Sequence, residues 1–293
     1  MLDLSDPIMV QGITGREASA MVEDMLAYGT KVVAGVTPGK GGQQVCGVPV
    51  FDTVGEAVAT CQLSVSIIAV PALAVLDAAL EAFSHGIKLC LILSERVPRL
   101  DASKLLMMAQ RQKCLVIGPN TLGLIRPGVG KIGTIGGRVD NVRRSFIPGH
   151  VAVLSRSGGM TTEIASFLSS RGIGQSIAIG IGGDALIGAD FTDLIELLEQ
   201  DKLTKSVVIY GEPGGVAEER LAKRLEQRKS HLRINAFFSG RFVDEMEGVR
   251  FGHAAVMVEG GRGSVRTKAA LLRESGVFVA ETFDEIITGL EQD

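Results

Sequence analysis

The chain alternates between short apolar runs rich in β-branched residues and longer segments in which apolar side chains recur every three or four positions. Residues 7–10 form the first run, and residues 16–28 then carry Met21, Val22 and Met25 on one helical face. This alternation predicts a parallel sheet covered by helices. The strands expected in the first half are 7–10, 31–36, 65–70, 88–93 and 115–117, and the helices are 16–28, 54–61, 74–84 and 100–112.

The same alternation returns in the second half after an interruption. Between residues 122 and 149 the periodic pattern is lost while Gly, Pro and charged residues accumulate, which indicates a domain boundary. We therefore expect two α/β domains, residues 1–125 and 149–293, joined by a linker over 126–148. The strands expected in the second half are 150–154, 176–179, 206–210, 233–237 and 278–280, and the helices are 161–171, 191–200, 216–226, 264–275 and one from 283.

Composition narrows the class of protein. A length of 293 residues fits two domains of about 150 residues each. The 33 acidic and 30 basic side chains nearly balance and aromatic residues make up 4%, so a nucleic-acid-binding protein is disfavoured. The four cysteines form no C-x-x-C pair, which is typical of small buried side chains in a reducing compartment. The most apolar stretch, residues 66–83, contains Pro71, Asp77 and Glu81, so we expect a soluble cytoplasmic protein without a membrane span.

The loops after the first-half strands carry phosphate-binding chemistry. In Gly12-Ile-Thr-Gly15, backbone N–H groups and a Thr hydroxyl stand at the start of a helix, where anions are favoured. Lys40 lies between glycines, and Ser94 and Glu95 follow the fourth strand. In open α/β sheets these loops border one ligand crevice. The G-x-G-x-x-G fingerprint is missing and no acid closes the second strand, so a nicotinamide oxidoreductase is disfavoured.

The second half carries a second anion site and a candidate nucleophile. Residues 155–163 form a turn of small residues that opens a helix, so free N–H groups and the helix dipole favour phosphate there. His253 lies in a glycine-flanked loop, and Glu212 lies in another strand-end loop of the same half. A carboxylate can hold a histidine in one tautomer and leave the other nitrogen free to act as nucleophile or base. Residues His85, His150 and His231 have no such partner motif.

A series of motifs runs along the whole chain. In order they are Gln11-Gly-Ile-Thr-Gly15, Gly35-Val-Thr-Pro-Gly-Lys-Gly-Gly42, Pro49-Val-Phe-Asp-Thr-Val54, Ile117-Gly-Pro-Asn120, Ser155-Arg-Ser-Gly-Gly159, Gly180-Ile-Gly-Gly-Asp184, Gly211-Glu212 with Gly214-Gly215, and Gly252-His-Ala254. Together they resemble the α subunits of the ADP- or GDP-forming succinate–CoA ligase family, which also includes malate–CoA ligase and the corresponding part of ATP-citrate lyase.

This resemblance implies an N-terminal Rossmann-like CoA-binding domain and a C-terminal flavodoxin-like domain, both with mainly parallel sheets. It implies that coenzyme A is bound by Thr14, Gly15, Arg16, Glu17, Lys40, Leu93, Ser94 and Glu95. It also implies that His253 is phosphorylated and that Glu212 orients its ring. The residues expected around the phosphoryl group are Ser155, Ser157, Gly158 and Gly159.

The activity implied by the resemblance is formation of an acyl-CoA from a carboxylic acid, CoA and ATP or GTP through the phosphohistidine. No P-loop is present, and we expect ATP/ADP or GTP/GDP with Mg²⁺ on a β subunit that carries an ATP-grasp site. We expect no metal ion in this chain itself, and neither a nucleic acid nor a membrane as partner.

Some positions depart from succinate-type members. Thr162 stands where those members carry a Tyr near the substrate carboxylate, and Thr121 replaces a Cys. The joint over residues 131–141 and Phe251-Gly-His253 look more like the citrate branch. Succinate–CoA ligase is therefore the main hypothesis. A citryl-CoA or malyl-CoA synthetase subunit and a non-catalytic acyl-CoA sensor are the alternatives.

Overall fold

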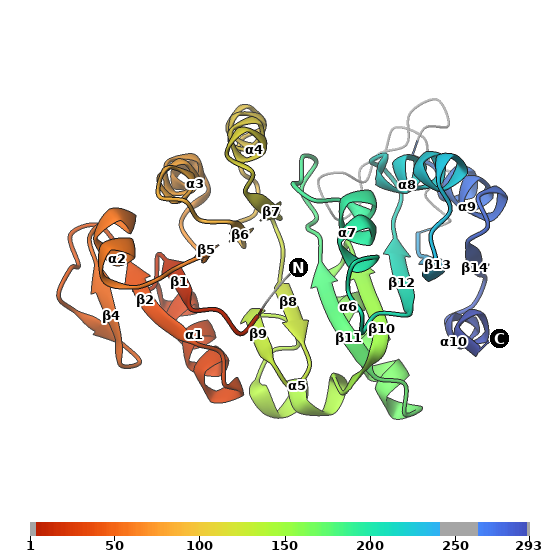
Figure 1. Ribbon diagram of the computed structural model, residues 1–293, viewed down its shortest axis with the longest axis horizontal. Helices are drawn as coiled ribbons and strands as arrows, with labels where there is room; N and C mark the ends of the chain where they lie inside the picture. The colour runs from red at the N-terminus through yellow and green to blue at the C-terminus, as the bar shows by residue number, and fades with distance from the viewer. Residues whose placement is uncertain (1–3, 241–262, 292–293) are drawn as a thin grey trace.

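The computed structural model describes residues 4–240 and 263–291. Two seven-stranded sheets lie side by side, each with helices packed against it (Figure 1). Both sheets are mainly parallel, so the predicted α/β class is confirmed.

The first sheet has the strand order β3-β4-β2-β1-β5-β6-β7, and its neighbours run parallel except in the short β3–β4 hairpin. Strand β1 lies between β2 and β5, so the chain leaves β1 to opposite sides and a topological switch point forms at its carboxyl end. The strands are β1 Ile8–Gln11, β2 Val32–Val36, β3 Gln44–Val45, β4 Val48–Phe51, β5 Val65–Ile68, β6 Leu89–Ile92 and β7 Leu115–Ile117.

The helices of the first half follow the predicted pattern closely. Helix α1 buries Met21, Val22 and Met25, and it ends at Gly29, whose left-handed φ of 107° suits a glycine C-cap. The helices are α1 Arg16–Tyr28, α2 Val54–Thr60, the 3₁₀ turn η1 Ala72–Ala74, α3 Val75–Ser84 and α4 Arg99–Gln112.

The second sheet has the order β14-β13-β12-β10-β11-β8-β9. Strand β10 lies between β11 and β12 and is parallel to both, which creates a second switch point at its carboxyl end. The strands are β8 Gly123–Arg126, β9 Gly130–Gly133, β10 Pro148–Ser155, β11 Gln175–Gly180, β12 Ser206–Gly211, β13 Arg233–Phe238 and β14 Phe278–Ala280.

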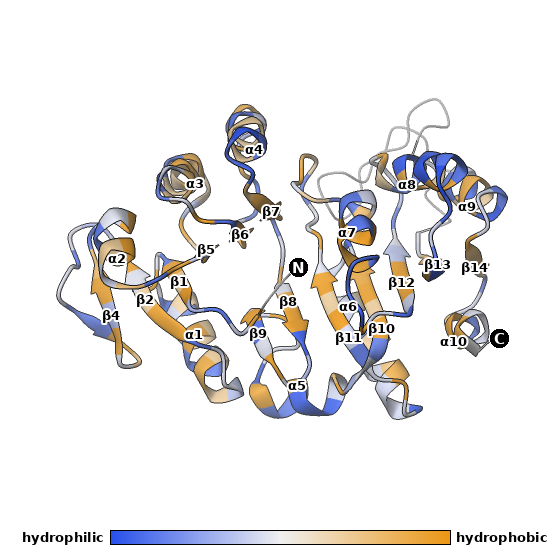
Figure 2. Cartoon of the chain, viewed as in Figure 1, coloured by the Kyte–Doolittle hydropathy of each residue, from blue (hydrophilic) through white to orange (hydrophobic). Residues whose placement is uncertain are grey.

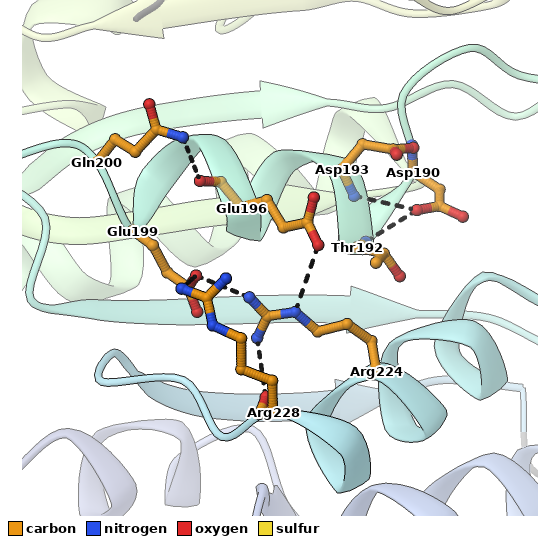
Figure 3. A network of polar contacts seen from close by, with 8 residues as sticks. All are labelled: Asp190, Thr192, Asp193, Glu196, Glu199, Gln200, Arg224 and Arg228. Carbon is orange, nitrogen blue, oxygen red and sulfur yellow. Dashed lines mark hydrogen bonds and ion pairs between the residues drawn. The ribbon is translucent and has the colours of Figure 1, made fainter.

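The helices of the second half are α5 Val139–Ser145, α6 Gly158–Ser170, α7 Phe191–Leu198, α8 Ala217–Gln227, α9 Val265–Glu274 and α10 Glu285–Glu291. A polar network joins α7 to α8 (Figure 3), in which Arg224 bonds to Glu199 at 2.7 Å. Burial acts to raise the pKa of Glu199, but the Arg224 hydrogen bond and the Arg228 charge outweigh it, so this pKa lies below its ordinary value. The network therefore favours an ionised Glu199 between the two helices.

The segment predicted as a linker, residues 126–148, holds regular structure. Strands β8 and β9 form an antiparallel hairpin that pairs through β8 with β11, and α5 follows. Gly123 has a φ of 105°, and a side chain there would overlap the Ile132 carbonyl, so glycine is required for the close pairing. The segment predicted as a linker thus contains elements that the sequence pattern did not indicate, and the division into 1–125, 126–148 and 149–293 stays a prediction.

The core is continuous between the sheets. One apolar cluster includes Ile8 and Val10 of the first sheet together with Leu124 and Leu154 of the second. The strands are accordingly hydrophobic while the outer helix faces are polar (Figure 2). Two cysteines are buried as expected, but Cys46 is exposed, so that expectation fails there. Within the described ranges, no helix has the length and apolar character needed to cross a bilayer.

Candidate functional site

A cavity of about 540 Å³ lies at the switch point of the first sheet, at the carboxyl ends of β1, β2 and β5. Its walls come from the loops after these strands and from α3. They include the predicted Thr14 and Gly15, and Gly12, Thr37 and Pro38 of the motifs quoted above. Further wall residues, to which the sequence assigned no site role, are Pro71, Ala74, Asp77 and Glu81.

The turn over residues 12–15 is shaped to keep this cavity open. Gly12 has a φ of 82°, and a side chain on it would overlap the Ala69 carbonyl of the neighbouring strand end. The Gly15 amide donates to the Gly12 carbonyl, and Gly15 is the N-cap residue of α1. Thr14 Oγ1 donates to Thr37 Oγ1 at 3.3 Å, which ties the β1 loop to the β2 loop. The start of α1 therefore lies on the cavity wall, and anion binding by its first N–H groups stays a prediction.

A second cavity of about 360 Å³ adjoins the first, because Ala69 and Val70 line both. Predicted residues on its walls are Glu17, Leu93, Ser94 and Glu95. The remaining walls include Met21 and three residues that follow β7 or β9, namely Thr121, Leu122 and Thr134. The structure thus brings six of the eight predicted CoA residues onto two adjoining cavities.

The other two predicted CoA residues lie beside the cavities rather than on their walls. Arg16 is the exposed first residue of α1. Lys40 is exposed in the turn after β2, where its amide donates to the Thr37 carbonyl. Thr37 lines the larger cavity, so the Lys40 backbone lies next to a residue of the cavity wall.

The predicted phosphate loop lies at the switch point of the second sheet. Strand β10 ends at Ser155, and α6 begins at Gly158, three residues earlier than the sequence pattern predicted. The earlier start has a local cause, because Ser157 caps the helix by accepting from the Met160 amide at 3.4 Å. Ser155 Oγ accepts from the Ser157 amide and donates to the Ser157 carbonyl, so it braces this turn.

The start of α6 has the chemistry that favours an anion, and phosphate binding there stays a prediction. The first-turn N–H groups of Gly158 and Gly159 have no acceptor within the helix, and the helix dipole adds positive potential. Thr162 lies in the next turn, half-buried, and does not belong to the walls of the two cavities described above. The contact of Thr162 with the substrate acid therefore stays a prediction.

The loop that carries Glu212 follows β12, next to the phosphate loop. Glu212 is 8% exposed. Lys268 of α9 is fully buried, and its ammonium donates to the carbonyls of Glu212 and Gly214 at 2.9 and 2.6 Å. It also pairs with Glu218 at 2.7 Å, where neither side chain is exposed. The buried ammonium thus holds the backbone of the Glu212 loop.

Burial perturbs two acids around this loop. It raises the pKa of Glu219, and the Lys268 charge opposes that rise only in part. Burial likewise raises the pKa of Tyr210, at the end of β12, and the nearby Glu212 charge adds to the shift. In both groups burial thus raises the pKa by penalising the charged form.

The cavities, the phosphate loop and the Glu212 loop form one continuous region. Leu122 lines the smaller cavity, and its side chain fills the space that a Cβ on Gly158 would occupy. On the other side of the phosphate loop, buried Arg156 donates to the Gly214 carbonyl at 3.1 Å. The structure thus joins sites that the sequence placed in separate halves.

His253 lies outside the described residues, as does the Gly252-His-Ala254 motif. The described ends of the chain on either side do contact the Glu212 loop. The Ser239 amide donates to the Gly211 carbonyl at 3.4 Å, and the Gly214 amide donates to the Gly263 carbonyl at 2.7 Å. Ser239 and Gly263, the described residues near the two ends of the gap at 241–262, therefore both lie at the Glu212 loop.

Sequence reasoning missed the residues that connect these loops. Arg156 and Asp184 stood inside quoted motifs, but their polar partners lie far away in the sequence. Lys268 and Glu218 had no motif, and only a charged residue at a core-facing helical position could have signalled them. Within the part of the chain that the structure describes, no three His, Cys, Asp or Glu side chains gather as a metal site would require.

Comparison with known proteins assigns the family. Residues 5–96 match the CoA binding domain, and residues 148–291 match the succinyl-CoA ligase like flavodoxin domain. The ADP-forming succinate–CoA ligase subunit alpha 1 of Archaeoglobus fulgidus is 42% identical over 287 residues, covering 98% of this chain and 95% of that protein. The corresponding alpha subunit of Methanothermobacter thermautotrophicus is 41% identical over 287 residues, covering 98% and 94%.

Among solved structures, the ATP citrate lyase of Methanosaeta concilii in complex with (3S)-citryl-CoA superimposes with a TM-score of 0.91. Its sequence identity is 24%, so the likeness concerns the fold, and this chain corresponds in full to 50% of that longer chain. The two family models support the predicted CoA-binding and flavodoxin-like folds. With the relatives at 41–42% identity, they show that the chain belongs to the family of succinate–CoA ligase α subunits.

Proposed function

We propose that this chain is the α subunit of an acid–CoA ligase that makes an acyl-CoA from a carboxylic acid, CoA and ATP or GTP through a phosphohistidine at His253. One observation carries the proposal: the wall of the CoA-sized crevice, at Leu122, is also in contact with the anion-binding start of α6, at Gly158. A thioester end and a phosphoryl group could therefore meet there.

The two cavities suit the two ends of CoA. The larger one lies at the start of α1, and exposed Lys40 follows Thr37 of its wall by three residues, which fits the nucleotide end with its phosphates. The smaller one leads from Val70 past Ser94 to Leu122, toward the phosphate loop, which fits the pantetheine arm with its amides and terminal thiol. In this orientation the thiol reaches the edge of the phosphate loop.

The phosphate loop would hold the phosphoryl group that His253 carries. The N–H groups of Gly158 and Gly159 stand at the positive end of the α6 dipole and would donate to the phosphoryl oxygens. Glu212, in its braced loop, would accept a hydrogen bond from one imidazole nitrogen and leave the other free to bear phosphate. The position of His253 in this arrangement is part of the proposal.

In the direction of synthesis, a carboxylate oxygen of the acid attacks the phosphorus on His253, and the neutral imidazole leaves. The product is an acyl phosphate. The CoA sulfur then attacks the acyl carbon, inorganic phosphate leaves, and the thioester remains. The α6 N-terminus stabilises the phosphate oxygens in both steps.

The proposal includes a partner. We assign ATP or GTP, with Mg²⁺, to a β subunit with an ATP-grasp site that charges His253. We also assign the protein to the cytoplasm, which agrees with its four free cysteines. Succinate is the proposed acid. Citrate and malate are the alternative acids, because Thr162 replaces the Tyr that succinate-type members carry near the substrate carboxylate.

The test is phosphoryl transfer in the presence of the β subunit. Incubation with γ-labelled ATP or GTP should give a label on this chain that survives base and is lost in acid. His253→Asn should abolish the label and leave CoA binding, measured by calorimetry, unchanged. Adding CoA with succinate, malate or citrate then identifies the acid that discharges the label. CoA binding without any labelling would contradict the ligase proposal and favour the acyl-CoA sensor.

A further inference from the structure

Asp184 is a buried acid to which the proposed reaction assigns no role. It belongs to the loop after β11, in the second sheet, and is 6% exposed. Its carboxylate reaches the loop that follows β6 in the first sheet. That loop carries Leu93, Ser94 and Glu95, which line the smaller cavity.

The contacts use both carboxylate oxygens. Oδ1 accepts from the Arg96 amide at 3.3 Å and from Asn120 Nδ2 at 3.2 Å. Oδ2 accepts from the Val97 amide at 3.2 Å. A carboxylate can serve three donors in this way, whereas an amide side chain has a single acceptor atom and would place an NH₂ group against an N–H.

The backbone that Asp184 holds is an unusual turn. Arg96 has a φ of 57°, in the left-handed region that non-glycine residues rarely adopt. Such a conformation persists only where the surroundings stabilise it. The Asp184 carboxylate caps the two amides at and just after this turn.

A second connection passes through Asn120. The backbone N–H of Asn120 donates to the Ser94 carbonyl at 3.0 Å, and the backbone carbonyl of Asn120 accepts from the Gly183 N–H at 3.1 Å. Ser94 in turn donates from Oγ to the Val70 carbonyl at 2.5 Å. The loops after β5, β6, β7 and β11 are therefore linked in a chain that ends on Asp184.

From this geometry we infer that Asp184 is a positioning residue for the pantetheine arm of CoA, acting from the second sheet through the loop over residues 93–97. It touches no substrate itself. Its effect is to hold the wall of the smaller cavity in the conformation that receives the arm. The inference rests on the proposed function, because it assumes that CoA occupies the two cavities.

The experiment compares two ligands on the α–β complex by calorimetry. CoA spans both cavities, whereas 3′-phospho-ADP carries only the nucleotide end. Asp184→Asn should weaken CoA binding about tenfold or more, because a buried N–H loses its acceptor, and it should leave 3′-phospho-ADP binding unchanged. In steady-state assays the KM for CoA should rise by a similar factor, while the KM for nucleotide stays constant.

The matched control is Asp201→Asn. Asp201 is also 6% exposed and also accepts from three donors, at Arg126, Leu203 and Thr204, but it lies away from the cavities. It should lower stability without changing either dissociation constant. Should Asp184→Asn fail to fold, Asn120→Ala removes one of the three donors and should weaken CoA binding in the same selective way.

The outcomes are distinct. Unchanged CoA affinity in the Asp184 and Asn120 variants, or equal weakening of both ligands, overturns the inference alone. Absence of CoA binding by the wild-type complex overturns the proposed function and this inference with it. Hydrogen exchange gives an independent readout, since the amides of Arg96 and Val97 should lose protection in Asp184→Asn and keep it in Asp201→Asn.

Discussion

The fully buried Lys268–Glu218 pair should fix the loop that carries Glu212, and Lys268→Met tests this. The substitution keeps much of the side-chain volume and removes the ammonium. Three contacts disappear, with Glu218 Oε2 and with the carbonyls of Glu212 and Gly214.

The expected loss of stability follows from these contacts. Glu218 stays at 0% exposure without its ammonium, and removing one partner of a buried ion pair costs about 3–5 kcal/mol. The Gly214 carbonyl keeps its hydrogen bond from Arg156. The Glu212 carbonyl loses the hydrogen bond from Lys268, which adds about 1 kcal/mol to the loss of stability. We expect the free energy of unfolding to fall by about 4–6 kcal/mol.

Urea denaturation at neutral pH measures this loss by linear extrapolation. Lys223→Met, an exposed lysine of α8, is the control and should change the free energy of unfolding by less than about 0.5 kcal/mol. The double variant Lys268→Met with Glu218→Gln should regain most of the loss, because no buried charge is left alone. A loss below about 1 kcal/mol in Lys268→Met, as at a surface ion pair, would refute the reasoning.

Two further predictions concern pH and the crevice. Burial raises the pKa of Glu219 above its ordinary value of 4.5, so the folded state holds this proton more tightly and stability should fall as pH rises from about 4.5 through the raised pKa. Glu219→Gln should remove that component from the pH profile of urea denaturation, and an unaltered profile would count against it. Gly12→Ala should abolish CoA binding in calorimetry, because the new Cβ meets the Ala69 carbonyl at the switch point. Gly29→Ala is its control. Gly29 also has a positive φ but open space around it, so it should cost about 1–2 kcal/mol of stability and leave CoA affinity unchanged.

The sequence predicted most strands and helices because their apolar periodicity is local. It failed over residues 126–148, where β9 is four residues long, begins and ends with glycine, and contains Lys131. A lysine predicts an exposed position, yet Lys131 is 1% exposed and its ammonium donates to the Gly137 carbonyl at 2.5 Å. Burial lowers the pKa of this lysine, opposed by the Asp24 charge. Whether such a segment forms a strand depends on its pairing with the rest of the sheet rather than on the local preference of its residues.

The candidate site shows the same division between local and distant information. The turn over residues 155–157 is held by hydrogen bonds among neighbouring residues, and the sequence predicted this turn, although it placed the start of α6 three residues too late. Asp184, by contrast, reaches residues 87 and 88 positions away, and Lys268 reaches carbonyls 54 and 56 positions away. A single sequence contains no signal for such contacts. The local turns could therefore be predicted, whereas the interactions that hold them together could not.

The topology explains why these interactions converge. In each sheet a topological switch point lies where neighbouring connections diverge, at the ends of β1 and β10. The chain passes from the first sheet to the second through the loop between β7 and β8, and that loop supplies Thr121 and Leu122 to the smaller cavity. Because Leu122 also packs at Gly158, a shift of one sheet relative to the other would move the cavity wall and the anion site together. Two separate switch points thus become one region, in which the same loop would position the thioester and the phosphoryl group of the proposed reaction.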